Sequence, residues 1–146
     1  MFYNNCVPKI DTFLDDCYTK EEHKMINETR KILNNPDMLI TATTVRVPVK
    51  NCHSESINVE FENNLDIYEA KVLLQNADGI ILTDDIDNNI YPLARKADGY
   101  NDVFVGRIRR DYSVKSGLNM WVVADNLRKG AATNAIQILE ILLNKS

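Results

Sequence analysis

Glycine is scarce in this sequence, and none of it forms a phosphate-binding loop. Five glycines occur among 146 residues, and neither the G-x-G-x-x-G nor the G-x-x-x-x-G-K pattern is present. In such loops, backbone N–H groups hold the phosphates of a nucleotide. If the protein uses a nucleotide, we therefore expect the main phosphate site to lie outside these residues.

Cysteine and histidine are also few, which argues against a disulfide framework and against a zinc site. The three cysteines are an odd number without paired spacing, and this favours a reduced protein of the cytoplasm. The two histidines, His23 and His53, lack the neighbouring cysteine or carboxylate pattern of a zinc site. We expect no metal.

Long apolar runs and an excess of positive charge are absent as well. No apolar stretch approaches the roughly 20 residues that a membrane span needs, and the first residues do not resemble a signal peptide. The net charge of −4 argues against a nucleic-acid surface, and the hydrophobic fraction of 45% is typical of a globular domain. We expect neither nucleic-acid nor membrane binding.

The pattern that is present alternates helices with strands. Apolar spacing predicts helices over 19–33, 65–76 and 126–143, and alternation predicts strands over 40–49, 56–61, 80–82, 103–110 and 118–124. Thr19 and Glu22 form a capping box, and Asp125 is expected to cap the last helix. Residues 83–102 are expected to form a long loop. This order predicts an α+β fold, with helices on one side of a mostly antiparallel or mixed sheet.

The predicted core follows from the same periodicities. We expect the sheet to bury the apolar side chains of Val45, Val47, Ile57, Val59, Val103 and Val105. We expect the second helix to turn inward the side chains of Leu65, Tyr68, Val72 and Leu73.

An arginine and a histidine lie seven positions apart in the stretch 45–56. The guanidinium of Arg46 can pair with a carboxylate through two hydrogen bonds, and His53 is suited to proton transfer near neutral pH. Together they predict a site that holds an anionic substrate and acts on it as an acid or a base. Each has a structural alternative: Arg46 fits an ordinary edge strand, and His53 fits a turn cap. We expect Cys52 to be a buried small residue rather than a nucleophile.

Two further groups carry weaker signals from the residues alone. Glu21 and Lys24 lie three positions apart on one face of the first helix, and this spacing favours a surface ion pair worth about 0–1 kcal/mol. The small residues around Gly130, near a helix start, allow a ligand or another backbone to approach. From the residues alone, tight helix packing is the favoured interpretation of this turn.

Several separate motifs, in this order, make the chain resemble the aspartate-semialdehyde dehydrogenase family almost from end to end. They are Val7-Pro8-Lys9-Ile10-Asp11, Tyr18-Thr19-Lys20-Glu21-Glu22-His23-Lys24-Met25, Asn27-Glu28-Thr29-Arg30-Lys31-Ile32, the stretch from Arg46 to His53, Val105-Gly106-Arg107-Ile108-Arg109 and Asp125-Asn126-Leu127-Arg128-Lys129-Gly130-Ala131-Ala132-Thr133-Asn134-Ala135. The resemblance is to the C-terminal half of the family. It implies a substrate-binding and dimerisation domain over residues 1–125 and, over residues 126–146, a helix that returns to the cofactor domain.

The resemblance also implies a reaction. The family carries out NADP-dependent reductive dephosphorylation of L-4-aspartyl phosphate to L-aspartate 4-semialdehyde, in lysine, threonine, methionine and diaminopimelate biosynthesis. A cysteine thiolate forms an acyl-enzyme, NADP exchanges hydride, and a histidine handles the protons.

The family's site residues carry over to six positions of this chain. His53 resembles the acid–base histidine, and Arg46 resembles the arginine that holds the substrate carboxylate. Glu21 resembles the carboxylate that faces the substrate ammonium, and Lys24 resembles a ligand of the phosphate. Asn134 and the turn at Gly130 resemble the segment that lies against the nicotinamide of NADP. We expect Arg46, Glu21, Lys24 and His53 to converge in one cleft.

The sequence also departs from the family. The nucleotide-binding half and the G-N-C nucleophile motif, which precede these segments in the family, are not found in the 146 residues. Asn51 and Cys52 stand before His53 where the resemblance implies a glycine-type residue. We expect a homodimer that is inactive alone and needs the missing half. The alternative is a non-catalytic dimerising module that binds an amino-acid anion.

Overall fold

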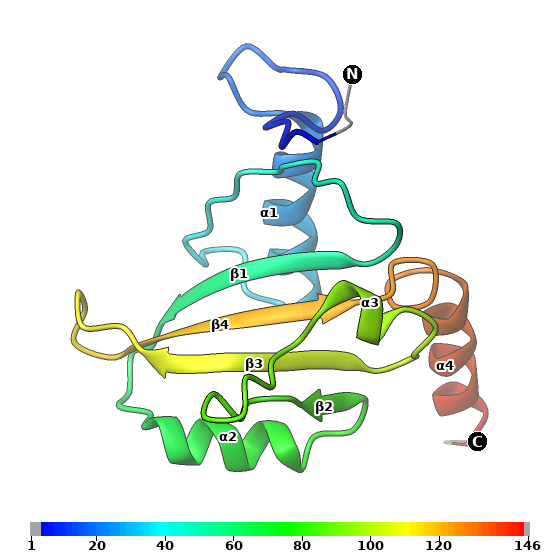
Figure 1. Ribbon diagram of the computed structural model, residues 1–146. Helices are drawn as coiled ribbons and strands as arrows, with labels where there is room; N and C mark the ends of the chain where they lie inside the picture. Colours follow the sequence, from blue (N-terminus) through cyan, green and yellow to red (C-terminus); the bar gives the residue numbers. More distant parts are fainter. Residues whose placement is uncertain (1–3, 145–146) are drawn as a thin grey trace. The chain divides into compact units, whose positions relative to one another are not determined.

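The computed structural model describes residues 4–144, and the chain divides into two compact units (Figure 1). Unit 1 covers residues 1–49 and unit 2 covers residues 50–146. The division expected at residue 125 concerns function, and it stays a prediction. None of the helices in the described part of the chain is long and apolar enough to cross a membrane.

Unit 2 is built on a four-stranded mixed sheet with the order β1-β4-β3-β2. β4 pairs antiparallel with both β1 and β3, and β2 pairs parallel with β3. The strands are β1 (His53–Glu60), β2 (Ile80–Leu82), β3 (Val103–Arg110) and β4 (Gly117–Ala124). The α+β class and the mixed sheet are confirmed, and four of the five expected strands lie within a few residues of their predicted places.

The sheet of unit 2 carries an apolar core on each face. Helix α2 (Ile67–Gln75) contributes Ala70 to a cluster with Val105, Ile108 and Leu118. A second cluster joins Phe104 and Val123 to Cys52 and to Ala97 of helix α3 (Ala94–Ala97). Adjacent residues of a strand point to opposite faces, so the two clusters lie on opposite sides of the sheet. The long loop expected over 83–102 thus contains the short helix α3, and the expectation of helices on one side of the sheet was wrong.

Helix α2 buries a different face from the one expected. Tyr68 and Leu73 are 78% and 59% exposed, whereas Ala70 is 5% exposed. The helix begins at Ile67 because the Asp66 carboxylate accepts the backbone N–H of Glu69 at 2.8 Å. Ile67 and Leu74 pack with Ala70 against the core, as does Leu65 just before the helix, which was predicted to face inward.

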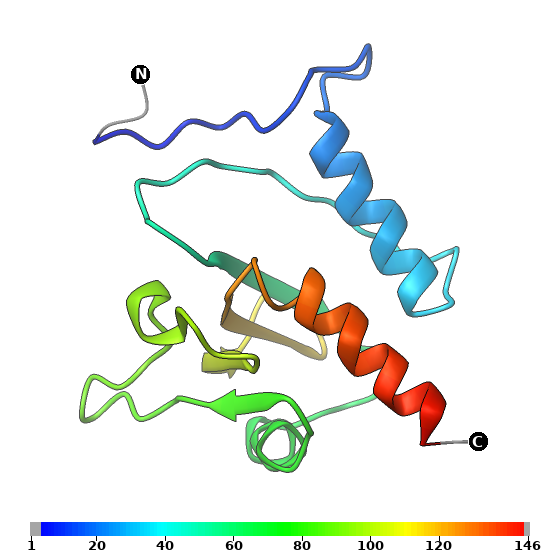
Figure 2. The ribbon, with the colours of Figure 1, turned by 90° about the vertical axis from the view of Figure 1, so that its right-hand side faces the viewer.

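The final helix also begins later than predicted. α4 (Ala132–Leu143), the orange-to-red helix of Figure 2, starts seven residues after Asp125. Its N-cap Ala131 makes no side-chain hydrogen bond. Asp125 instead accepts backbone N–H groups from Leu127 and Gly99, both at 2.8 Å. Its carboxylate is therefore committed to the turn after β4, and the expectation that it caps α4 was wrong.

Unit 1 contains helix α1 (Lys20–Ile32) with the predicted capping box. The Thr19 hydroxyl accepts the Glu22 N–H at 3.3 Å, and the Glu22 carboxylate accepts the Thr19 N–H at 2.7 Å. These reciprocal bonds satisfy two N–H groups at the helix start.

The strand expected over 40–49 is not formed, and this prediction was wrong. Arg46 makes a single antiparallel bridge to Val7, with two backbone hydrogen bonds of 2.9 Å. The bridge cannot lengthen on one side because the Thr44 N–H is donated to Glu22 and the Lys9 N–H to Val7. On the other side Pro48 has no N–H to donate. Without a sheet to cover them, Val45 and Val47 are 39% and 45% exposed.

Candidate functional site

In unit 1, the Glu22 side chain joins the two segments that carry the predicted anion-binding residues. This side chain is 7% exposed. One of its oxygens accepts the N–H of Thr19 at 2.7 Å, and the other accepts the N–H of Thr44 at 2.9 Å. One carboxylate thus ties the first turn of α1 to the segment that carries Arg46, two residues beyond Thr44.

The hydrogen bonds of Glu22 also set its charge state. The N–H groups of Thr19 and Thr44 point at the carboxylate and lower the pKa of Glu22, because they stabilise its charged form. The carboxylate is therefore ionised at neutral pH, and it accepts both bonds there.

Glu21 and Lys24 lie three residues apart near the start of α1. Lys24 Nζ is 3.4 Å from Glu21 Oε1, and the two side chains are 54% and 29% exposed. The ion pair favoured by their spacing is confirmed, and both charges remain within reach of solvent. Arg46 is exposed, and its guanidinium has no hydrogen-bond or ion-pair partner among residues 4–144. Unit 1 therefore offers two cations and one carboxylate that a ligand can reach.

His53 is the first residue of β1, in unit 2. It lies opposite Ala124, at the end of the ladder between β1 and β4. The residue is exposed, and its ring has no hydrogen-bond partner in the described part of the chain. The alternative role of a turn cap through the ring nitrogen is therefore not observed. An accessible imidazole at a strand end is suited to proton exchange with a ligand.

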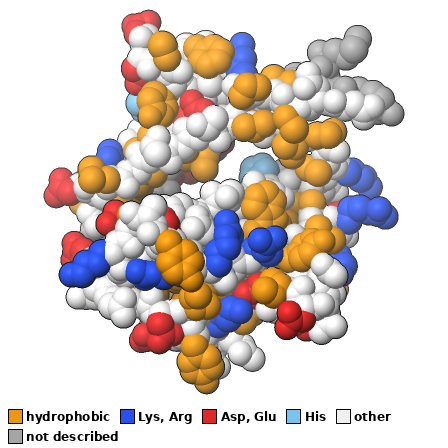
Figure 3. Space-filling view, turned by 60° about the vertical axis from the view of Figure 1, so that its left-hand side comes forward, with side chains coloured by type: hydrophobic (Ala, Val, Ile, Leu, Met, Phe, Trp, Pro, Cys, Tyr) orange, Lys and Arg blue, Asp and Glu red, His pale blue; other side chains and the backbone are white. Residues whose placement is uncertain are grey.

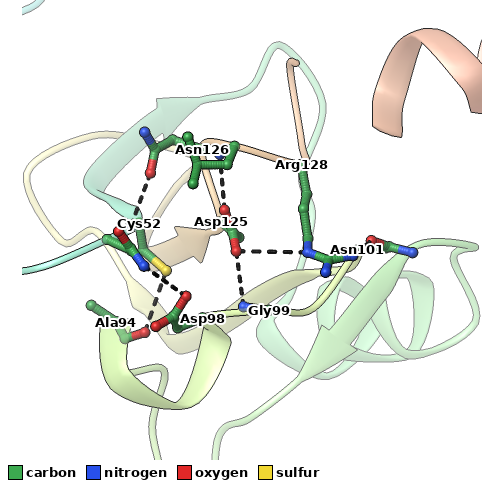
Figure 4. A network of polar contacts seen from close by, with 10 residues as sticks. Cys52, Ala94, Asp98, Gly99, Asn101, Asp125, Asn126 and Arg128 are labelled. Carbon is green, nitrogen blue, oxygen red and sulfur yellow. Dashed lines mark hydrogen bonds and ion pairs between the residues drawn. The ribbon is translucent and has the colours of Figure 1, made fainter. Parts of the chain in front are cut away.

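The residue before His53 is held by a network of polar contacts (Figure 4). Cys52 donates its backbone N–H to the Asn126 side-chain oxygen at 2.9 Å and its thiol to the Ala94 carbonyl at 3.3 Å. Cys52 is 6% exposed, so the expectation of a buried small residue is confirmed. Burial raises the pKa of the Cys52 thiol, and the nearby Asp125 and Asp98 carboxylates raise it further. A thiol in this environment is a poor nucleophile.

Asp125 anchors the turn on the other side of this network. It accepts the N–H groups of Gly99 and Leu127, which lower its pKa, and Arg128 lies 3.9 Å away. The side chain is 4% exposed. The turn that leads from β4 to α4 is thereby fixed next to the strand end that carries His53.

Gly130 and Asn134 follow in this turn and in the first turn of α4. Gly130 has a φ of 76°, and a Cβ built there would meet no atom within 4 Å. The space beside Gly130 is therefore open to a ligand, and the positive φ explains why glycine is suited to the position. Asn134 is half-buried, and its backbone N–H bonds to Arg128 at 3.1 Å. The expected role of both residues beside a cofactor stays a prediction.

The six predicted residues fall into two groups. Unit 1 holds Glu21, Lys24 and Arg46, and unit 2 holds His53, Gly130 and Asn134. The convergence of the two groups in one cleft stays a prediction.

Sequence reasoning missed the supporting residues of both groups. It gave Glu22 only a capping role, and it gave Asn126 none. The sequence offered one signal for a residue such as Asn126. Cys52 stands where the resemblance implies a glycine-type residue, and a cysteine backbone in a glycine-type conformation needs an additional restraint.

Unit 2 is an α+β domain built on a four-stranded mixed sheet, and unit 1 carries charges of both signs at its surface. The family of semialdehyde dehydrogenase dimerisation domains matches residues 2–129. The chain belongs to this family.

Aspartate-semialdehyde dehydrogenases are similar to this chain over almost its whole length. The aspartate-semialdehyde dehydrogenase of Aquifex aeolicus is 52% identical over 141 residues, which are 97% of this chain and 42% of that protein. The Bacillus subtilis enzyme is 49% identical over 139 residues, covering 94% of this chain and 40% of that protein. The chain thus spans about two-fifths of the length of these relatives, and it corresponds to their C-terminal part.

Solved structures show the same fold. Aspartate semialdehyde dehydrogenase II from Vibrio cholerae superposes with a TM-score of 0.91 at 48% identity, over 97% of this chain and 42% of that one. A structure of that protein complexed with ASA gives a TM-score of 0.90 at 49% identity, over 96% of this chain and 41% of that one. The Candida albicans enzyme with NADP gives 0.74 at 28% identity, over 97% of this chain and 45% of that one.

Proposed function

We propose that this chain is the substrate-binding and dimerising part of an NADP-dependent aspartate-semialdehyde dehydrogenase. That enzyme converts L-4-aspartyl phosphate to L-aspartate 4-semialdehyde and phosphate, in the biosynthesis of lysine, threonine, methionine and diaminopimelate. The observation that carries the proposal is the family match over residues 2–129, and the resemblance of six site positions to the family pattern supports it. Three free thiols, at Cys6, Cys17 and Cys52, favour a cytoplasmic location.

The charges of unit 1 are complementary to such a substrate. An aspartyl phosphate presents a carboxylate, an ammonium and a phosphate. Arg46 binds the carboxylate through two parallel hydrogen bonds, Glu21 pairs with the ammonium, and Lys24 binds the phosphate. In the free protein Glu21 and Lys24 pair with each other at 3.4 Å, so substrate binding exchanges one weak surface pair for two new ones.

His53 acts as the acid–base group. Its exposed ring donates a proton to the reacting oxygen or takes one from it, and no internal partner competes for its nitrogens in the described residues. The buried Cys52 does not serve as the nucleophile. The nucleophilic thiolate comes from outside these 146 residues, because none of their cysteines lies in the family motif.

NADP is proposed as the cofactor, with its main binding site outside these residues. When bound, it supplies or accepts the hydride. In this chain the side-chain amide of Asn134 would hold the nicotinamide, and the open space beside Gly130 would admit its ring. Residues 126–146 thereby act as the segment that returns to the cofactor domain.

Dimerisation is the second part of the proposal. The family is a dimerisation domain, and Figure 3 shows hydrophobic side chains on the surface among charged ones. Unit 2 has large hydrophobic side chains that are at least half exposed, among them Tyr68, Leu73, Ile86, Tyr100 and Tyr112. Such side chains favour association with a second copy. Sedimentation at micromolar concentration should give a dimer, and a monomer alone would count against this part.

A chimera tests the catalytic proposal. In the Aquifex aeolicus enzyme, the matched segment is replaced by the corresponding residues of this chain, and NADP reduction is followed with aspartate semialdehyde and phosphate. We expect activity from the chimera and none from residues 1–146 alone.

Two substitutions in the chimera separate binding from proton transfer. Arg46→Ala should raise KM for aspartate semialdehyde about 10- to 100-fold, because a charged hydrogen-bonded pair is lost. His53→Ala should lower kcat about 10²- to 10⁴-fold. Arg95→Ala and His23→Ala are the matched controls, and both should stay near the parent. An active chimera that is indifferent to His53→Ala would refute the acid–base role.

The competing hypothesis is a non-catalytic dimerising module that binds an amino-acid anion. It is favoured by one observation, the match of residues 2–129 to a family described as a dimerisation domain. A folded, dimeric chimera that binds aspartate semialdehyde but shows no turnover would support this hypothesis over the first.

A further inference from the structure

The residue before His53 has an unusual backbone conformation. Cys52 has a φ of 75°, in the left-handed region that residues with a Cβ rarely adopt. It is also 6% exposed. A glycine would take this conformation at no steric cost, whereas cysteine keeps it only if neighbouring groups hold it in place.

The Asn126 side chain is the group best placed to hold it. The ladder between β1 and β4 ends at the pair His53 and Ala124. One residue beyond that end, the Cys52 N–H is donated to the Asn126 side-chain oxygen at 2.9 Å (Figure 4). Asn126 therefore adds one hydrogen bond past the last pair of the sheet, at the point where strands otherwise fray.

The hydrogen bonds made by the side chains of residues 51 and 52 do not involve the backbone N–H of Cys52. The Cys52 thiol donates to the Ala94 carbonyl at 3.3 Å, and the Asn51 side chain donates to Asp98 at 3.0 Å. Both contacts are made by side chains, and neither fixes the peptide group of Cys52. The bond to Asn126 is the contact that restrains this peptide group directly.

We propose that Asn126 is a positioning residue for His53: its amide oxygen locks the left-handed backbone at Cys52 and so fixes the strand end from which the imidazole works. The inference rests on the proposed function in one respect, the acid–base role of His53. Asn126 itself touches no reacting atom. Its effect on the reaction passes through the orientation of His53, where an error of about 1 Å can lower a rate 100-fold.

The first experiment needs no activity. Amide hydrogen exchange and the ring signals of the two histidines are measured by NMR in residues 1–146. Asn126→Ala should speed exchange at Cys52 and His53 at least tenfold and should broaden the His53 ring signal. His23, in unit 1, is the internal reference and should not change. Asn126→Asp keeps the acceptor oxygen and should stay within threefold of the parent.

A control variant tests whether any loss in the network has the same effect. Asn101 accepts a bond from Arg128 at 2.8 Å in the same network but does not contact Cys52. Asn101→Ala should leave the His53 signal unchanged. The proposal is overturned if Asn126→Ala leaves exchange at Cys52 and His53 within threefold of the parent, or if Asn101→Ala changes His53 equally.

The second experiment measures kcat and KM in the chimera, both with Cys52 and with the substitution Cys52→Gly. Asn126→Ala should lower kcat about tenfold or more with KM within twofold of the parent. Cys52→Gly removes the disfavoured conformation, so the same Asn126→Ala change should there lower kcat less than threefold. Equal losses on the two backgrounds, or a change in KM alone, would overturn the proposal.

Folding failure is also decisive. If Asn126→Ala unfolds the parent but not the Cys52→Gly protein, Asn126 holds Cys52 as proposed. If it unfolds both, Asn126 is a general structural residue and the proposal is wrong. If the chimera has no activity, the proposed function fails. The exchange data still test whether Asn126 restrains the backbone of Cys52.

Discussion

The two units bury opposite kinds of residue. In unit 1 the buried side chains among residues 4–49 are Thr19, Glu22 and Thr44, all of them polar. In unit 2 the buried side chains are mostly apolar and lie on both faces of a sheet, with Leu118 and Val123 at 1% and 0% exposure. Unit 1 is thus held by directed hydrogen bonds, and unit 2 by apolar packing.

This difference has a consequence for the stability of the two units. A hydrogen-bonded carboxylate such as Glu22 fixes two segments in one geometry but adds little stability, whereas apolar burial adds stability without direction. Unit 1 also exposes Ile32 and Leu39, at 79% and 94%. We therefore expect unit 1 to be the less stable of the two units.

The largest expected effect is on the apolar core of unit 2. Leu118→Ala should lower the free energy of unfolding of unit 2 by about 2–5 kcal/mol, because it leaves a cavity among packed side chains. Fluorescence of Trp121, the one tryptophan of the chain, follows this unfolding in urea. Leu127→Ala, at a 65% exposed position, is the control and should have little effect. Equal losses from both changes would mean that unit 2 is not held by its core.

A smaller effect is expected at the capping box of unit 1. Thr19→Ala should lower the stability of α1 by about 1 kcal/mol, because the Glu22 N–H loses its acceptor. Amide exchange in Lys20–Ile32 measures this change. Thr43→Ala, at an exposed position one residue before Thr44, is the control. If Trp121 fluorescence detects the Thr19→Ala change as strongly as amide exchange does, the two units do not differ as described.

The smallest effect is on the pH dependence of unit 1. Because the folded pKa of Glu22 is lowered, its carboxylate stabilises unit 1 above the pKa of the unfolded state, about 4.3. This stabilisation is lost as pH falls through the lower folded pKa. The Thr44 amide signal should follow that titration, and Glu22→Gln should abolish it, while Glu28→Gln should not. A Thr44 titration that survives in Glu22→Gln would assign it to another group.

Prediction from sequence was most successful where the signal is local. The capping box of Thr19 and Glu22 and the pairing of Glu21 with Lys24 involve residues three positions apart, and all were identified. Two predictions that depended on a distant partner were wrong. The stretch 40–49 has strand-like residues, but Glu22 takes the Thr44 N–H and Pro48 lacks one, so no ladder forms. Asp125 was expected to cap the last helix, but its carboxylate accepts the backbone N–H of Gly99 instead.

The sequence by itself determined the family, the α+β class and the residues proposed to bind and act on the substrate, because these depend on residue identity and short-range order. Only the tertiary structure decided what holds those residues in place. The bond from Cys52 to Asn126 joins positions 74 residues apart, and the bond from Thr44 to Glu22 joins positions 22 apart. Which acceptor a backbone N–H finds over such distances depends on how the whole chain folds, and no local pattern encodes it.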